Sequence, residues 1–173
     1  MLDLFLQILW LMLPAYAANM IPVFFSRVKL GRYLDSPVDL GRSFMGKRVF
    51  GDHKTVKGFL IGTLLAVAVA LVQHTLIGSY SAMFAVSLGA LMGFGALVGD
   101  SVESFIKRRI GIKSGRPFPV FDQIDFPIGA LLFASIIVEF DLGFMALAVV
   151  ISGILSFLAD VVGYFLGIKK VWW

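Results

Sequence analysis

Long apolar runs, separated by short charged segments, constrain the fold of this chain more than any other feature of its sequence. A helix needs about 20 residues to cross about 30 Å of hydrocarbon. Hydrophobic residues make up 59% of the 173 residues, whereas ordinary soluble domains hold roughly 45–50%. The apolar surplus requires lipid around it. The sequence therefore predicts an all-α integral membrane protein.

We expect about five membrane-crossing helices in a single transmembrane domain, residues 1–173. The predicted spans are 4–25, 59–76, 82–98, 121–138 and 144–168. The first lacks the basic start of a cleaved signal peptide, so we expect a retained helix. The fourth has a clean apolar run that is too short to cross alone, so it must begin near Phe121. Asp122 and Asp125 then reach the membrane boundary, where a carboxylate usually has a task or a partner.

The positions of the basic residues indicate the orientation. Of the 15 lysines and arginines, eight lie in segment 27–57 and five in segment 99–125, and the connectors 77–81 and 139–143 hold none. By the positive-inside rule, the loops 27–57 and 99–120 and the C-terminus are cytoplasmic, and the N-terminus is outside. The closing segment 169–173, with two lysines and two tryptophans, is typical of an interface anchor.

Composition narrows the chemistry that the chain can perform. There is no cysteine, which excludes disulfides, thiolate nucleophiles and thiolate metal sites. His53 and His74 lie on opposite sides of an apolar span, so we expect any metal to be a hard cation on carboxylates, with Mg2+ as the first candidate. Segment 41–48 nearly matches a phosphate-binding loop, but Arg48 stands where serine or threonine is needed. A basic loop attracted to anionic lipid head groups is the alternative interpretation.

Carboxylates in and after the second loop favour a catalytic site. Asp100, Glu103 and Lys107 are three and four residues apart, so they share one face of a helix. Asp122 and Asp125 are again three residues apart. Such carboxylates hold a divalent cation, and neighbouring lysines and arginines hold phosphate oxygens. For the exposed Arg32 and Arg109 we expect surface ion pairs instead.

A long motif resembles the signature of the membrane cytidylyltransferases that make CDP-activated lipids. It consists of Ser104, Lys107, Arg108, Lys113, Asp122 and Asp125. Ser114 departs from the diacylglycerol enzymes, which have aspartate there, and Val120-Phe121 replaces their histidine-glycine-glycine segment. The stretch 113–126, the Asn19-Met-Ile-Pro22 element and the short length are similar to the archaeal CDP-archaeol synthase family. This resemblance covers residues 14–173.

The resemblance implies a CTP-dependent nucleotidyltransferase that acts on a lipid phosphate. The implied reaction is Mg2+-dependent transfer of a cytidylyl group from CTP to 2,3-bis-O-geranylgeranylglycerol 1-phosphate, an isoprenoid ether lipid. Pyrophosphate is released. The implied enzyme is a multi-pass protein of the cell membrane with its active site at the cytoplasmic face, and it needs no nucleic acid. Its oligomeric state is left open.

The resemblance and the charge pattern together name the candidate site residues. The expected catalytic residues are Asp100, Asp122, Asp125 and Lys113, and the three aspartates are also the expected metal ligands. Nucleotide and phosphate contacts are expected from Asn19, Lys47, Lys54, Lys57, Glu103, Lys107, Arg108 and Arg116. Glu103 is also a candidate third carboxylate. For Asp160, inside the last span, a hydrogen bond between helices is an equal alternative to a role in the site.

Three alternatives to this function stay open. A CDP-diacylglycerol synthase would differ in the lipid, and a CTP-dependent polyprenol kinase would use the same charges to phosphorylate an alcohol. A small channel or transporter would place charges along a path through the membrane, whereas the outer half of every predicted span is apolar. Small residues in the third and fifth spans permit close helix packing or leave a groove for lipid chains, and the sequence favours neither interpretation. These residues are Gly89, Ala90, Gly93, Gly95, Ala96, Gly153 and Gly163.

The charge pattern predicts the result of a labelling experiment. Cysteines introduced at Arg32 and at Gly115 should resist an impermeant thiol reagent in intact cells, because both loops face the cytoplasm. A cysteine introduced at Ser79 should react. Labelling of the Gly115 variant from outside would refute this topology.

Overall fold

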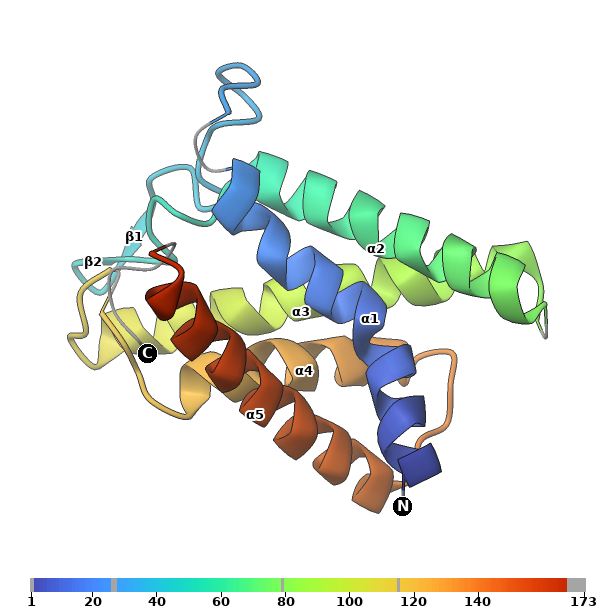
Figure 1. The fold of residues 1–173 in the computed structure, drawn as a ribbon. Coiled ribbons are helices and arrows are strands. Elements are labelled where there is room, and N and C mark those ends of the chain that lie inside the picture. Colours follow the sequence, from blue (N-terminus) through green and yellow to red (C-terminus); the bar gives the residue numbers. More distant parts are fainter. Residues whose placement is uncertain (1, 26–27, 79, 115, 168–173) are drawn as a thin grey trace.

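Five helices account for most of the chain in the computed structural model (Figure 1). They are α1 (Leu2–Phe25), α2 (Val56–Ile77), α3 (Ala82–Arg109), α4 (Phe121–Ala134) and α5 (Leu142–Phe165). A small antiparallel hairpin, β1 (Ser43–Phe44) and β2 (Lys47–Arg48), lies in the first long loop. The structure describes residues 2–25, 28–78, 80–114 and 116–167. The predicted anchor at 169–173 and the labelling positions 79 and 115 lie outside the described residues.

The predicted all-α membrane fold is confirmed, and the short hairpin is its one addition among the described residues. Helices α1, α2, α3 and α5 are long and apolar enough to cross a membrane. Helix α4 begins at Phe121 as expected but ends at Ala134, four residues before the end of the predicted span 121–138. Its 14 residues extend about 21 Å at the helical rise, less than the hydrocarbon thickness of about 30 Å. Helix α3 instead continues past the predicted end of its span to Arg109.

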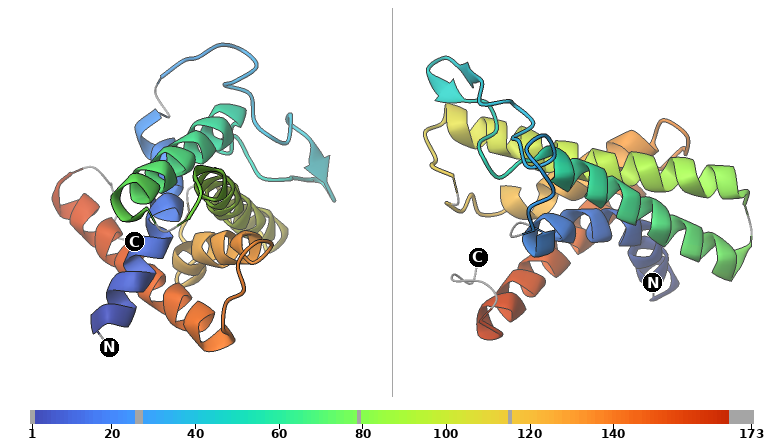
Figure 2. Two further views of the ribbon diagram at one scale, coloured as in Figure 1. Left: turned by 90° about the vertical axis from the view of Figure 1, so that its right-hand side faces the viewer. Right: turned by 90° about the horizontal axis from the view of Figure 1, so that it is seen from above.

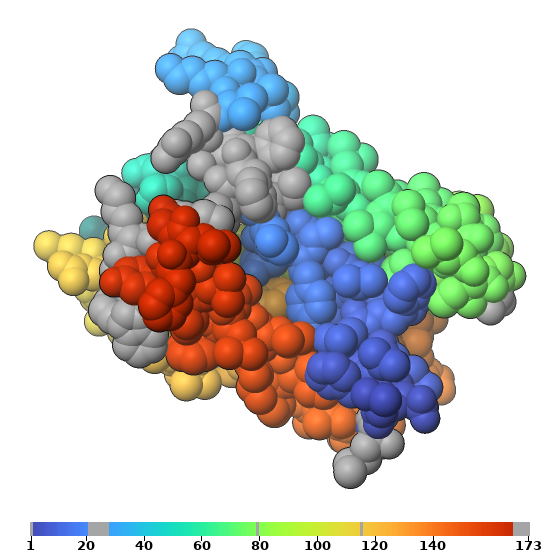
Figure 3. All heavy atoms as spheres, in the orientation of Figure 1, coloured from blue at the N-terminus to red at the C-terminus, as the bar shows by residue number. Residues whose placement is uncertain are grey.

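Helix α3 is the centre of the fold. It packs against α1, α2 and α4, whereas α5 packs on α4 and on part of α1. Helix α5 lies on the opposite side of the molecule from α2, with α1 and α4 between them (Figure 2). In the space-filling view, α5 crosses the front of the molecule and part of the first long loop, in light blue, stands clear of the helices (Figure 3). The long loops therefore gather at one end of the helices.

A buried cluster joins α1 to α3, α4 and α5. Met12, Met92 and Phe126 are almost completely buried within it. The Tyr16 ring contacts Phe126 edge-on at 6.0 Å between centroids. The Tyr16 hydroxyl lies 2.8 Å from Ser152 Oγ, which links α1 to α5. This junction connects the short α4 to both of its long neighbours.

Glycines of α3 permit close packing against α2. A Cβ atom added at Gly93 would lie 2.4 Å from Ala66 Cβ, and one added at Gly89 would lie 2.8 Å from the Ala66 carbonyl oxygen. Real Cβ atoms do not approach other atoms so closely. For these two glycines the structure therefore supports helix packing and not a groove for lipid chains.

Gln73 of α2 compensates for a proline in α1. Pro14 has no N–H to donate to the Trp10 carbonyl, four residues earlier in α1. The Gln73 Nε2 atom donates a hydrogen bond to that oxygen at 2.6 Å. Gln73 is 5% exposed, so no bulk water competes for the bond. A helix interrupted by proline is thus held by its neighbour.

Replacing Gln73 should destabilise the protein without touching the loops. Gln73→Met keeps the side-chain length but leaves the Trp10 carbonyl unpaired, and we expect a loss of about 1–3 kcal/mol. The matched control is Thr75→Val, because the exposed Thr75 hydroxyl donates only within its own helix, to Val72. Thermal unfolding in detergent measures both variants. Equal melting temperatures for the two variants would contradict the assigned role of Gln73.

Candidate active site

Three carboxylates converge where α3 and α4 meet, at the end of the helices that carries the long loops. Asp100 and Glu103 lie on α3 and Asp125 lies on α4. One oxygen from each carboxylate lies within 4.8 Å of the others. Glu103 is only 5% exposed. Burying like charges this closely is unfavourable unless a cation lies among them.

Contacts between backbones bring these carboxylates together. A Cβ atom added at Gly99 would lie 2.2 Å from the Asp125 carbonyl oxygen, and one added at Gly129 would lie 2.2 Å from the Gly95 carbonyl oxygen. Gly95 and Gly99 are four residues apart, the spacing at which small residues let two membrane helices approach. Only glycine permits this separation of α3 and α4. The Gly-x-x-x-Gly pattern was the sequence signal for the contact, and Gly99 and Gly129 were not predicted as members of it.

Two lysines balance part of the negative charge. The Lys54 ammonium donates a short hydrogen bond to Asp100 Oδ2. Lys107 Nζ donates to Asp122 Oδ1 at 2.5 Å and lies 2.9 Å from Glu103 Oε1. That Glu103 oxygen is buried, and its described partner is the Lys107 ammonium. The two lysines therefore offset part of the charge of the cluster.

Both carboxylate oxygens of Asp122 accept hydrogen bonds, and its role as a metal ligand stays a prediction. Its Oδ1 atom accepts from Lys107 and its Oδ2 atom accepts from the Phe118 N–H at 2.8 Å. Both oxygens are therefore engaged at the start of α4. The structure groups Glu103, and not Asp122, with Asp100 and Asp125. Asp122 joins the cluster through Lys107.

Asp39 organises the first long loop. Its carboxylate accepts hydrogen bonds from the N–H groups of Gly41, Phe50 and Gly51 at 3.0 to 3.2 Å and from Arg48 Nη2 at 2.9 Å. Burial alone would raise the pKa of Asp39, but these donors outweigh it and hold the pKa at about 2. The loop leads to Lys54, whose carbonyl accepts from the Val38 N–H at 2.8 Å. Asp39 was not predicted from sequence.

Arg109 fastens the hairpin to the end of α3, which corrects the expectation of an exposed ion pair. Its guanidinium donates to the carbonyl oxygens of Phe44, Lys47 and Arg48. It also lies 4.7 Å from the centre of the Phe105 ring, a cation–π distance. Lys47 Nζ donates to the Arg109 carbonyl at 3.0 Å. The two long loops are thereby joined.

The remaining predicted cations and Asn19 lie around the cluster. Lys57 is buried and donates to the Val28 carbonyl at 2.6 Å and to Asp35 Oδ1 at 2.7 Å, so it holds the first loop. Arg108 Nη1 donates to the Ile112 carbonyl at 2.6 Å. Three predicted side chains make no hydrogen bond or ion pair with other described residues: Lys113, Arg116 and Asn19. The first two are exposed, and Asn19 is half-buried.

The carboxylate cluster fits a hard divalent cation. Its donors are all oxygens, the preference of Mg2+, which binds at about 2.1 Å. The separation of the three oxygens, at most 4.8 Å, requires little closure to share one ion. The buried Glu103 Oε1 atom, whose described partner is Lys107 Nζ at 2.9 Å, is a group to which a cation would add a second positive partner. Next to the lysines, such a site can neutralise a polyphosphate and align it with an anionic nucleophile.

Comparison with known proteins identifies relatives along the whole chain. The sequence profile of the family described as CarS-like: CDP-archaeol synthase matches residues 1–173. A CDP-archaeol synthase of Methanocaldococcus jannaschii is 36% identical over 95% of this chain and 95% of its own length. A CDP-archaeol synthase of Pyrococcus abyssi is 38% identical, also over 95% of each chain.

A solved structure is similar in fold as well. It is described as an intramembrane enzyme for archaeal membrane lipids biosynthesis. It superposes with a TM-score of 0.75 and 35% identity, over 90% of this chain and 93% of that chain. The likeness therefore extends over most of the chain.

The glycine contact generates a prediction for metal binding. Gly99→Ala should push α4 away from α3, because the new Cβ meets the rigid Asp125 carbonyl. Moving Asp125 from Asp100 should weaken Mn2+ binding more than about tenfold, as changes around metal ligands do. The control is Gly153→Ala, whose Cβ would meet the γ2 methyl group of Ile124 at 3.1 Å, a side-chain contact and not a backbone one. Electron paramagnetic resonance of Mn2+ measures both, and unchanged affinity in Gly99→Ala would disprove the positioning role.

Proposed function

The chain belongs to the CarS-like family of CDP-archaeol synthases, and we propose that it transfers a cytidylyl group from CTP to 2,3-bis-O-geranylgeranylglycerol 1-phosphate. The protein is thus a nucleotidyltransferase of archaeal lipid biosynthesis. We propose CTP as its nucleotide substrate and the geranylgeranyl ether lipid as its acceptor. The observation that supports it best is the carboxylate cluster Asp100, Glu103 and Asp125, with Lys54 and Lys107 beside it.

The proposed reaction exchanges one phosphate bond for another. An oxygen of the lipid phosphate attacks the α-phosphorus of CTP and forms a new P–O bond. The bond from the α-phosphorus to the bridging oxygen breaks, and its electron pair leaves with pyrophosphate. The phosphate is already anionic, so no side chain has to be deprotonated to act as a nucleophile, and a chain without cysteine is sufficient.

The side chains of the cluster align two polyanions and neutralise their charge. Asp100, Glu103 and Asp125 would hold Mg2+, which supplies charge neutralisation for the triphosphate when bound. Lys54 and Lys107 stand beside these carboxylates and are the nearest cations for phosphate oxygens. Asp122 keeps Lys107 in place through their ion pair. We therefore propose Asp122 as a positioning residue.

Outer residues would complete the nucleotide site. Lys113 and Arg116 are exposed on the segment between α3 and α4, where the triphosphate can reach them. The others are proposed to act from the loops or from α1, and they are Lys47, Lys57, Arg108 and Asn19. The charge distribution of the long loops supports placing this site at the cytoplasmic face of the cell membrane.

An isotope experiment tests the reaction type. Purified protein receives CTP labelled at the α- or the γ-phosphate, with Mg2+ and either ether-linked or ester-linked lipid phosphates. We expect the α-label in the lipid and the γ-label in pyrophosphate. A γ-label in a lipid alcohol would establish a kinase instead, and preference for the ester lipid would establish a diacylglycerol enzyme.

Neutral replacements in the cluster should abolish turnover. We expect Asp100→Asn, Glu103→Gln and Asp125→Asn each to lower activity more than about 100-fold, because each removes a hard ligand. Asp122→Asn should lower activity as well, through Lys107. The control is Asp52→Asn, since Asp52 is exposed and pairs only with Arg48. Near-normal activity in the three cluster variants, with unchanged Mn2+ affinity, would refute the metal-site assignment.

A further inference from the structure

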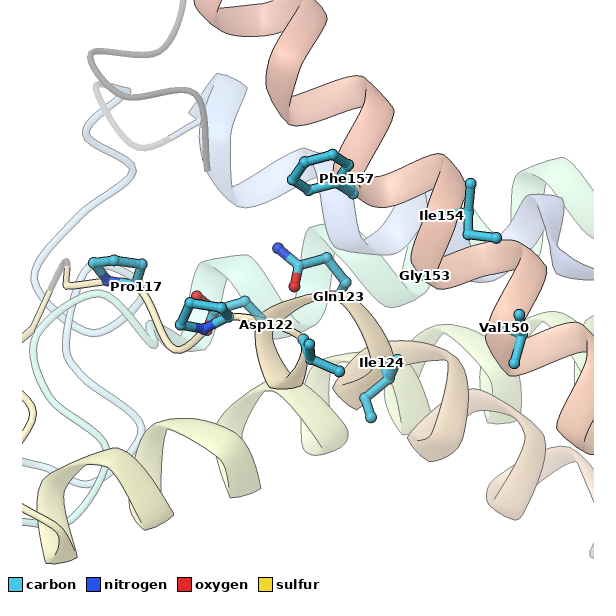
Figure 4. Close-up of a pocket in the computed structure, with 10 residues that line it drawn as sticks. Pro117, Asp122, Gln123, Ile124, Val150, Gly153, Ile154 and Phe157 are labelled. Carbon is cyan, nitrogen blue, oxygen red and sulfur yellow. The ribbon is translucent and has the colours of Figure 1, made fainter.

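An apolar groove runs between the start of α4 and the middle of α5. Its volume is about 700 Å³, within the range of about 300–1,000 Å³ that is usual for small-molecule sites. Figure 4 shows Val150, Ile154 and Phe157 of α5 on one side and Asp122, Gln123 and Ile124 of α4 on the other. Gly153 of α5 also lines the groove, and a Cβ atom added there would lie 3.1 Å from the Ile124 side chain of α4.

Gln123 is a polar residue without a partner in this apolar groove. It is 7% exposed, and its side-chain amide makes no hydrogen bond with any described group. In Figure 4 the amide points into the space between α4 and α5. The nearby Pro127 also has no N–H to donate to the Gln123 carbonyl. An amide that has no hydrogen-bond partner among apolar side chains would gain one from a ligand oxygen placed in the groove.

One end of the groove adjoins the carboxylate cluster. Asp122 lines the groove and binds Lys107, which lies 2.9 Å from Glu103. Val120, at the same end, has a φ of 73°, a conformation that β-branched residues rarely adopt. Such strained residues often lie at ligand sites. The groove thus leads from an apolar region to the proposed site of phosphate chemistry.

We propose that this groove holds the hydrocarbon chains of the acceptor lipid and that Gln123 donates a hydrogen bond to its glycerol ether oxygens. The inference rests on the proposed function, because the occupant is the lipid phosphate of that reaction. Its chains match the apolar wall of the groove, its first polar atoms match the buried amide, and its phosphate reaches Lys107. One molecule thereby satisfies all three features.

Variants that fill the groove test this proposal, because they should change the KM for the lipid and not the KM for CTP. Gly153→Leu should raise the apparent KM for the ether-lipid phosphate about tenfold and leave the KM for CTP unchanged. The matched control is Ala159→Leu, because Ala159 is exposed on the opposite face of α5. Ile154→Trp provides a second obstruction at an exposed position if Gly153→Leu does not fold. Gln123→Leu should raise the same KM about tenfold, with Mn2+ affinity unchanged.

Photo-crosslinking identifies the occupant without relying on turnover. A glycerol 1-phosphate ether lipid with a diazirine in one chain should label the region of Ile154 and Phe157, and unmodified acceptor should compete. Competition by a zwitterionic membrane lipid alone would show a bulk-lipid contact and overturn the proposal. So would labelling elsewhere, or equal KM values in wild type and all groove variants. If the wild type forms no CDP-lipid although competed labelling occurs, the proposed reaction fails and the groove assignment stands.

Discussion

The backbone contact between α3 and α4 is the constraint on which the proposed site depends. Gly99 faces the Asp125 carbonyl and Gly129 faces the Gly95 carbonyl, so the helices touch without intervening side chains. This contact places Asp125 beside Asp100 and Glu103. It also fixes the start of α4, where Asp122 and Gln123 line the groove and Asp122 binds Lys107. A wider separation would disperse all of these groups.

Charge balance explains how such a cluster persists beside apolar helices. Each carboxylate near the boundary has a lysine within ion-pair distance or a close neighbour that has one. Lys107 is shared between α3 and α4, so it links the helices electrostatically as the glycines link them sterically. The first loop contributes Lys54, and Asp39 and Arg109 hold that loop in position. The first long loop is therefore part of the proposed site, because it supplies the lysine that pairs with Asp100.

The helices could be predicted from sequence because lipid imposes a minimum apolar length, and every predicted span contains a helix. The carboxylates could be predicted because Asp100 and Glu103 share a helical face. The positions of Asp122 and Arg109 could not, since each depends on a partner distant in sequence: Lys107 for Asp122 and the hairpin carbonyls for Arg109. The end of α4 at Ala134 was also missed, because the apolar residues that follow it resemble a continuing helix.

The short length of α4 has a consequence for the lipid around it. One side of α4 is uncovered at Ile128 and Leu132, so hydrocarbon meets a helix of 14 residues beside neighbours of 24 and 28. Such hydrophobic mismatch is relieved by local thinning of the bilayer, at fractions of a kcal/mol per Å. Thinned bilayer lowers the work of moving a charged head group along a protein surface. By this principle a bilayer beside α4 would be thinner than the surrounding membrane, whether or not a substrate is bound.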